Sequence, residues 1–143
     1  MKKTILWKIV LILLPVLTFG LELMPDSVSV MLEEGPYQCS FFGTLPDGSH
    51  PLGLGVAAML TVITAVTAVV ACFSKKQPWY TALIWVSLAA ATRSVFPLLT
   101  RANPPVLPTV IVALLLLVES FLAYLYMAQN RKEGSKKLSA PTL

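Results

Sequence analysis

The sequence is poor in charged residues. Asp, Glu, Lys and Arg make up 13% of its 143 residues, whereas a water-soluble domain typically carries about a quarter. Hydrophobic residues account for 56% of the chain. A soluble domain of this size needs a charged exterior, so this hydrophobic excess requires a hydrocarbon solvent. The composition excludes an ordinary soluble domain and predicts an integral membrane protein.

Residue types that carry chemistry are also scarce. The chain has one histidine and two cysteines, Cys39 and Cys72, and no CxxC pair, which argues against a thiol oxidoreductase and a zinc site. His50 stands near Asp47 and Ser49, but this spacing matches no known metal-ligand pattern. An intramembrane enzyme would need a nucleophile or a metal site, and the sequence offers neither clearly. We therefore expect no enzymatic activity, no cofactor and no metal.

Four apolar runs are long enough to cross about 30 Å of hydrocarbon, which takes roughly 20 helical residues. They cover residues 4–20, 51–73, 78–99 and 107–127. The first run is short, and the alternative is a cleaved signal peptide, although Thr18-Phe19-Gly20 is a poor cleavage site. We predict an all-α integral membrane protein that forms a single domain, a four-helix transmembrane bundle with up-down-up-down topology.

The basic residues fix the predicted orientation. Lys and Arg gather at the start of the first run, between the second and third, and after the fourth, whereas the 21–50 loop has acidic residues but no Lys or Arg. In a four-span chain all three basic segments fall on one side, which the positive-inside rule assigns to the cytoplasm. Both termini, including the 128–143 tail, are therefore expected in the cytoplasm. We expect the protein in a cell membrane, and the charge bias, short length and compact loops fit a bacterial inner membrane. The nine basic residues at the edges of the runs are Lys2, Lys3, Lys8, Lys75, Lys76, Arg131, Lys132, Lys136 and Lys137. Basic residues placed in this way orient a chain in the bilayer and do not form a nucleic-acid patch.

The 21–50 loop predicts a small extracytoplasmic β-hairpin. Residues 27–32 alternate polar and apolar side chains, residues 33–36 have a turn composition, and residues 37–42 form a second β-rich run. An isolated hairpin is marginally stable in water, so we expect this one to rest on the outer helix ends or on a partner. The polar segment from Arg131 onward is expected to be disordered.

Two charged residues lie well inside the apolar runs, farther from their ends than Lys8 is from the start of the first run. Glu119 lies near the middle of the fourth run, and Arg93 lies about six residues from the outer end of the third. An ionised carboxylate at that depth costs about 2.5–3.5 kcal/mol on insertion scales, so Glu119 should face the bundle interior or a wet cavity. The Cα atoms differ in depth by roughly 9 Å, so an ion pair is feasible. The alternatives are that Arg93 extends to the outer headgroups and that Glu119 serves an ion or substrate site.

Small residues recur at close spacing in the second and third runs. Such residues let helix backbones approach closely, which is how membrane helices pack without a hydrophobic driving force. The pattern fits packing within one bundle and also a seam between identical copies. The candidate packing positions are Gly53, Gly55, Ala57, Ala58, Thr61, Ala65, Ala68, Ser87, Ala91 and Ser94.

No functional motif decides among the remaining hypotheses. The absence of catalytic groups, together with the packing stripes and the acidic outer loop, favours a non-enzymatic accessory, assembly or interaction subunit. Its partners would be the lipid bilayer and another membrane protein or a second copy of itself, and not nucleic acid. The alternative is a homo-oligomeric small transporter or channel that uses the intramembrane carboxylate of Glu119.

Overall fold

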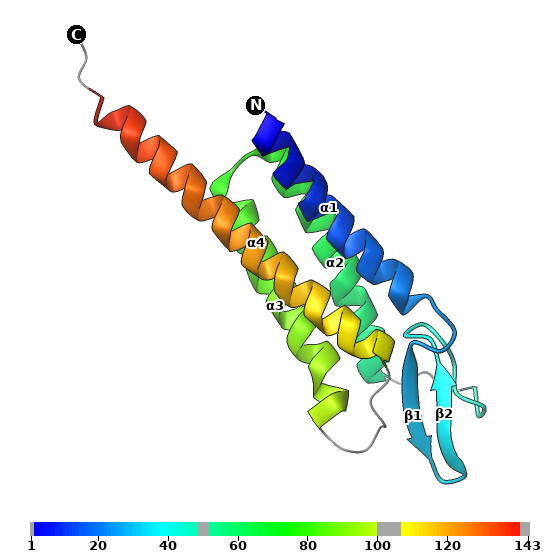
Figure 1. Ribbon diagram of the computed structural model, residues 1–143. Helices are drawn as coiled ribbons and strands as arrows, with labels where there is room; N and C mark the ends of the chain where they lie inside the picture. The colour runs from blue at the N-terminus through cyan, green and yellow to red at the C-terminus, as the bar shows by residue number, and fades with distance from the viewer. Residues whose placement is uncertain (1, 49–51, 100–106, 141–143) are drawn as a thin grey trace.

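The computed structural model describes residues 2–48, 52–99 and 107–140, without the side chains of residues 97–99. Four helices and a two-stranded sheet follow one another along the chain (Figure 1). They are α1 (Lys2–Glu22), β1 (Val28–Leu32), β2 (Gly35–Cys39), α2 (Leu52–Ser74), α3 (Gln77–Leu99) and α4 (Leu107–Leu138). Ser49, His50 and the first residue of the second run, all named above, lie outside the described residues, as does the 100–106 segment with Arg101, between the third and fourth runs.

The predicted four-helix architecture is confirmed. Helix α1 packs on α2 and α4, and α3 packs on the same two helices, so the four helices form a closed ring (Figure 1). Three helices, α1, α2 and α4, are long and apolar enough over the described residues to cross a membrane. Helix α3 forms as predicted but is not among these three, because Arg93 and a polar first turn make it less apolar.

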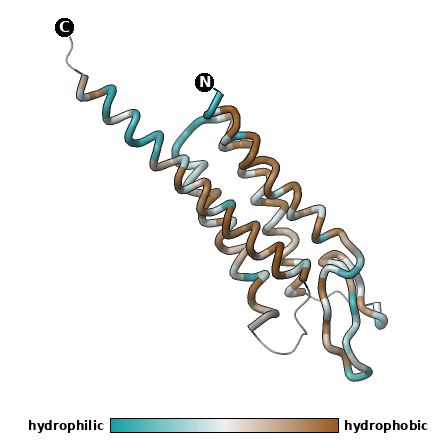
Figure 2. The backbone as a smooth tube through the Cα atoms, viewed as in Figure 1, coloured by the Kyte–Doolittle hydropathy of each residue, from teal (hydrophilic) through white to brown (hydrophobic). Residues whose placement is uncertain are grey.

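The bundle has two ends, which we name by what lies there. At the hairpin end α1 finishes, α2 begins and the β-hairpin sits; at the tail end α1 begins and α4 projects beyond the other helices (Figure 1). One cluster of buried apolar residues fills the hairpin end and a second fills the tail end. Many large apolar side chains on the outer surface remain exposed, including Leu13, Val66 and Phe121. Figure 2 shows apolar residues along much of the bundle and polar ones on the projecting part of α4.

The predicted β-hairpin is also confirmed, with shifted limits. Strands β1 and β2 pair antiparallel, with Leu32 opposite Gly35, so only Glu33 and Glu34 form the turn. Gly35 has φ = 127°, a conformation that residues with a Cβ rarely adopt. The second strand ends at Cys39 and not at residue 42, because the chain then leaves the sheet and buries Phe41.

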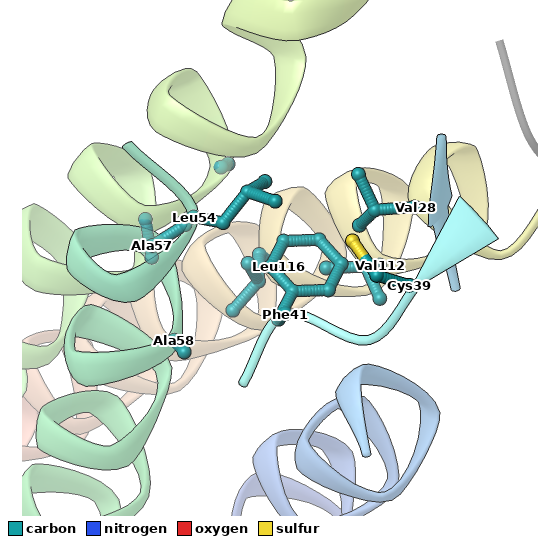
Figure 3. Close-up of a cluster of buried hydrophobic side chains, with 10 residues drawn as sticks. Val28, Cys39, Phe41, Leu54, Ala57, Ala58, Val112 and Leu116 are labelled. Carbon is teal, nitrogen blue, oxygen red and sulfur yellow. The ribbon is translucent and has the colours of Figure 1, made fainter. Parts of the chain in front are cut away.

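The hairpin rests on the helix ends, the first of the two supports expected from the sequence. The Phe41 side chain is 1% exposed and packs beside Leu54, Val112 and Leu116 in the cluster at the hairpin end (Figure 3). The Phe41 N–H donates to the Glu22 carbonyl at 3.2 Å. Such contacts supply the burial that an isolated two-stranded hairpin lacks.

The expectation of a disordered tail is wrong for residues 131–138. Helix α4 continues without a break to Leu138, about 16 Å beyond residue 127. Every residue of this extension from position 129 onward is exposed. The extension grows from a packed stem, so it avoids the cost of nucleation. Its Arg, Lys, Glu and Leu residues favour the helix despite Gly134.

Candidate functional site

Arg93 lies at the surface of the bundle and Glu119 in its interior, and the two side chains do not pair. Glu119 is fully buried inside the bundle, and neither of its carboxylate oxygens has a hydrogen-bond partner in the described part of the chain. Arg93 is half-buried at the surface of α3. Leu83, Ser87, Ala90 and Ser94 form the buried face of α3. Arg93 lies at the edge of this face, and its side chain extends along the outer surface of the bundle.

The Arg93 guanidinium lies at the hairpin end of an apolar groove. Its carbon is 5.3 Å from the centroid of the Phe96 ring, a cation–π contact. It also lies over Gly53 in the first turn of α2, where a Cβ atom would come within 2.5 Å of Nη2. A side chain at position 53 would therefore require the guanidinium to shift, because it passes close to the backbone.

This groove runs between α2 and α3 on the outer surface and has a volume of about 510 Å³. We call it the Arg93 groove. Trp85, one of its wall residues, is 66% exposed and lies eight residues into α3, about 12 Å along the helix axis. The other principal lining residues are Leu60, Leu88, Thr92, Arg93 and Phe96.

The Glu119 carboxylate lies in a bundle interior that contains several buried hydroxyl groups. Most of them donate to the carbonyl four residues earlier in the same helix, as Thr64 does to Leu60 at 2.8 Å and Ser87 to Leu83 at 2.7 Å. Ser120 instead bonds across helices, to the Ile84 carbonyl at 3.3 Å. These hydroxyls therefore use their protons on the backbone and do not serve the carboxylate. They keep lone pairs with which they can accept a bond from a proton donor or a cation.

A second buried carboxylate was missed by the sequence interpretation, which assigned Glu22 to the outer loop. It is the last residue of α1 and is fully buried. Thr61 Oγ1 on α2 donates to Glu22 Oε1 at 2.7 Å, whereas Glu22 Oε2 has no partner among the residues described. A signal was present in the sequence, because Leu11, Pro15, Thr18 and Glu22 recur at intervals of three and four, which place them on one helix face.

The candidate packing residues of α2 and α3 lie against neighbouring helices of the same chain. Seven of the ten positions are buried, and the remaining three, Gly53, Gly55 and Ala65, are half-buried. The stripe therefore packs within one bundle in this structure. Whether copies of the chain also associate stays a prediction. The seven buried positions are Ala57, Ala58, Thr61, Ala68, Ser87, Ala91 and Ser94.

Other residue types that could bind a ligand are dispersed. Cys39 and Cys72 are buried free thiols, and Cys72 lies in the cluster at the tail end while Cys39 lies in the cluster at the hairpin end. Over residues 2–48, 52–99 and 107–140, no three His, Cys, Asp or Glu side chains come together as metal ligands would.

Comparisons of the chain with protein-family models, with curated proteins and with solved structures found no match. Function has to be argued from the residues themselves. Two features stand out, the Arg93 groove on the outside of the bundle and the Glu119 carboxylate inside it.

Proposed function

We propose that this protein is a non-enzymatic interaction subunit of a cell membrane that binds a different membrane protein through the Arg93 groove. The observation that carries the proposal is the position of Arg93, on an apolar outer groove whose lining residues include no Asp or Glu. A charged side chain costs about 2.5–3.5 kcal/mol at the centre of a bilayer on insertion scales, and the Arg93 guanidinium, which lies beside the first turn of α2, bears a smaller part of this cost. A carboxylate on a partner helix would offset this cost.

The proposal includes four membrane spans, with both termini in the cytoplasm and the hairpin outside. The arrangement of the bundle supports it, because the start of α1, the α2–α3 turn and the end of α4 share the tail end (Figure 1). Nine of the eleven basic residues lie in these three segments, as the positive-inside rule requires of a cytoplasmic face. In this arrangement α3 crosses the membrane together with the other three helices, because it packs against α2 and α4, which are both apolar.

Trp85 supports a protein partner for the groove. Tryptophan in membrane proteins prefers the interfaces, where its N–H meets water or headgroups. Trp85 is largely exposed, yet it lies about two turns from the start of α3. In four-span topology its indole N–H would face hydrocarbon, and a docked helix would cover both the ring and the N–H.

The charges of the chain favour a different protein over a second copy. Both carboxylates in the apolar part of the helices, Glu22 and Glu119, are fully buried in their own bundle. A second copy therefore presents no carboxylate to Arg93 from its apolar helix surfaces. The proposed partner is a membrane protein with a transmembrane helix that carries an Asp or Glu in the outer third of its span.

Site-specific photo-crosslinking in the native membrane tests this proposal. A photoreactive residue in place of Trp85 should crosslink to one discrete protein, whereas the same residue in place of Phe121, an equally exposed aromatic on α4, should give only lipid adducts. Arg93→Gln should abolish the crosslink. Exchanging the charges, Arg93→Glu here and acid→Arg in the partner, should restore it.

Two results would contradict the proposal. A crosslink that persists in Arg93→Gln would show that the charge has no role in docking and that Arg93 extends to the headgroups. Crosslinks only between copies of this chain would replace the partner by a homo-oligomer.

A second candidate function is supported by the unpartnered Glu119 carboxylate. In this alternative the group binds a proton or a small cation, and the protein is a small transporter or channel. Glu119 faces the interior of one bundle, so the site would lie within a single chain and not on the axis of an oligomer. Glu119→Gln should then abolish ion or substrate flux in liposomes, and Glu133→Gln, a change at an exposed position, should not. Unchanged flux in Glu119→Gln would exclude this function.

A further inference from the structure

A cleft opens at the tail end of the bundle, between α1, the α2–α3 turn and α4. Its volume is about 500 Å³, and a second cleft of about 310 Å³ adjoins it through shared wall residues. We call the two together the tail-end cleft. Lys75, Tyr80 and Asn130 line both parts, Lys8 lines the first and Arg131 lines the second.

The charge of the cleft is strongly one-sided. Lys8, Lys75 and Arg131 contribute three positive charges, and no Asp or Glu lines either part. Lys8 is held in place, because its ammonium donates to the Cys72 carbonyl at 2.9 Å, at the end of α2. An ammonium has three donors, so two remain for a ligand. In the surrounding segments at this end Glu133 is the single acidic residue beside nine basic ones.

A buried hydroxyl also lines the cleft. Tyr80 is 2% exposed, and its hydroxyl finds no hydrogen-bond partner in good geometry among the described residues, although the Tyr126 side chain lies within reach. Its ring packs on that of Tyr126, with centroids 5.1 Å apart, and the Trp7 ring also contacts Tyr126, with centroids 6.3 Å apart. This aromatic wall fixes the Tyr80 side chain, and a buried donor left unpaired costs stability unless a ligand accepts from it.

We infer that the tail-end cleft binds a phosphate group, supplied by the headgroup of an anionic phospholipid. Phosphate is recognised in proteins by lysine and arginine charges together with neutral donors, which is the set that Lys8, Lys75, Arg131 and Tyr80 offer. Anionic lipids enrich the cytoplasmic leaflet. That the phosphate comes from a lipid rests on the membrane topology proposed above, but it does not depend on the Arg93 groove.

The test is native mass spectrometry of the full-length protein, purified without lipid and mixed with phosphatidylglycerol or phosphatidylcholine in non-ionic detergent. We expect adducts with phosphatidylglycerol to exceed those with phosphatidylcholine. Lys75→Asn with Arg131→Gln should reduce phosphatidylglycerol binding about tenfold or more, because hydrogen bonds to charged groups are the strong ones. Asparagine is chosen because Lys75 has φ = 56°, which Asn tolerates.

The matched control is Lys132→Gln with Lys136→Gln, which removes the same charge from exposed positions on α4 and should change binding less than twofold. Tyr80→Phe changes no charge and should still weaken binding several-fold. Circular dichroism in detergent verifies that each variant folds.

Three outcomes separate the possibilities. Equal loss in the control pair, or no loss in Tyr80→Phe, would overturn the inference in favour of a diffuse charge effect. Equal adducts with both lipids would also overturn it. Displacement of phosphatidylglycerol by millimolar inorganic phosphate, without headgroup preference, would keep the phosphate site but assign it to a soluble ligand.

Discussion

Replacing Glu119 by leucine should make the bundle more stable. The carboxyl group is fully buried, and neither oxygen has a hydrogen-bond partner in the described part of the chain. A buried polar group without a partner costs about 1–3 kcal/mol relative to solvation in water. Leucine is similar in size and carries no polar atom, so it removes this cost without opening a large cavity. The free energy of unfolding should therefore rise by about 1–3 kcal/mol.

Equilibrium unfolding of the purified protein in mixed micelles, with increasing SDS and helix content followed by circular dichroism, measures this change. Val118→Leu is the control, because Val118 is the exposed neighbour of Glu119, and surface substitutions usually change stability by less than about 0.5 kcal/mol. A fall in stability of more than about 1 kcal/mol in Glu119→Leu would refute the reasoning, because it would mean that the carboxyl group has a stabilising partner in the folded protein.

The result bears on function as well as stability. In most of a folded protein, each residue suits the environment in which the fold places it. Buried groups that destabilise the fold are exceptions, and they occur mainly at functional sites. Increased stability together with lost flux would favour the transport alternative for Glu119. Increased stability with no change in flux or in Trp85 crosslinking would leave Glu119 outside both proposed functions.

Three further predictions address the hairpin end. Phe41→Ala should lower the free energy of unfolding by about 3–5 kcal/mol, because Phe41 is 1% exposed, while Phe42→Ala, at a residue 38% exposed, should cost clearly less in the same SDS titration. Gly53→Ala should raise the free energy of unfolding by less than Gly55→Ala does. Alanine favours a helix over glycine by about 1 kcal/mol at both positions, but at position 53 the Arg93 guanidinium must shift to admit the Cβ, whereas open space surrounds position 55; equal effects would contradict the proposed close approach. Burial raises the pKa of the Cys39 thiol above its ordinary value of 9.0. At pH 8 the folded protein therefore has less of the reactive thiolate than the unfolded protein. Maleimide should label Cys39 more slowly in the folded protein than in the unfolded one, and labelling of the folded protein should accelerate as the pH rises. Equal labelling rates in both states would show that Cys39 is not buried.

The sequence predicted the helices well because each depends on local composition. The ends of the predicted runs and of the helices agree to within two residues, except at the end of α4. That exception has a physical cause, since residues 128–138 have too few apolar side chains to predict packing, yet they extend a helix that is already nucleated. The hairpin was predictable for the same local reason, an alternating strand followed by a turn.

The pairing of charged residues was not predictable in this way. Depth along the axis allowed an ion pair between Arg93 and Glu119, but rotation about each helix decides whether two side chains meet. That rotation depends on which faces the four helices bury against one another. It turned Glu119 inward and left Arg93 at the surface.

The sequence alone therefore determined the helices, the hairpin and the concentration of basic residues in three segments, because hydrophobic periodicity and turn chemistry act over short stretches of chain. Only the tertiary structure decided what surrounds each polar side chain. It brought Thr61 to Glu22, left Glu119 without a partner, and gathered Lys8, Lys75 and Tyr80 from three helices or their ends around one cleft. Such contacts join residues far apart in sequence, and they exist only once helix packing has fixed both depth and rotation.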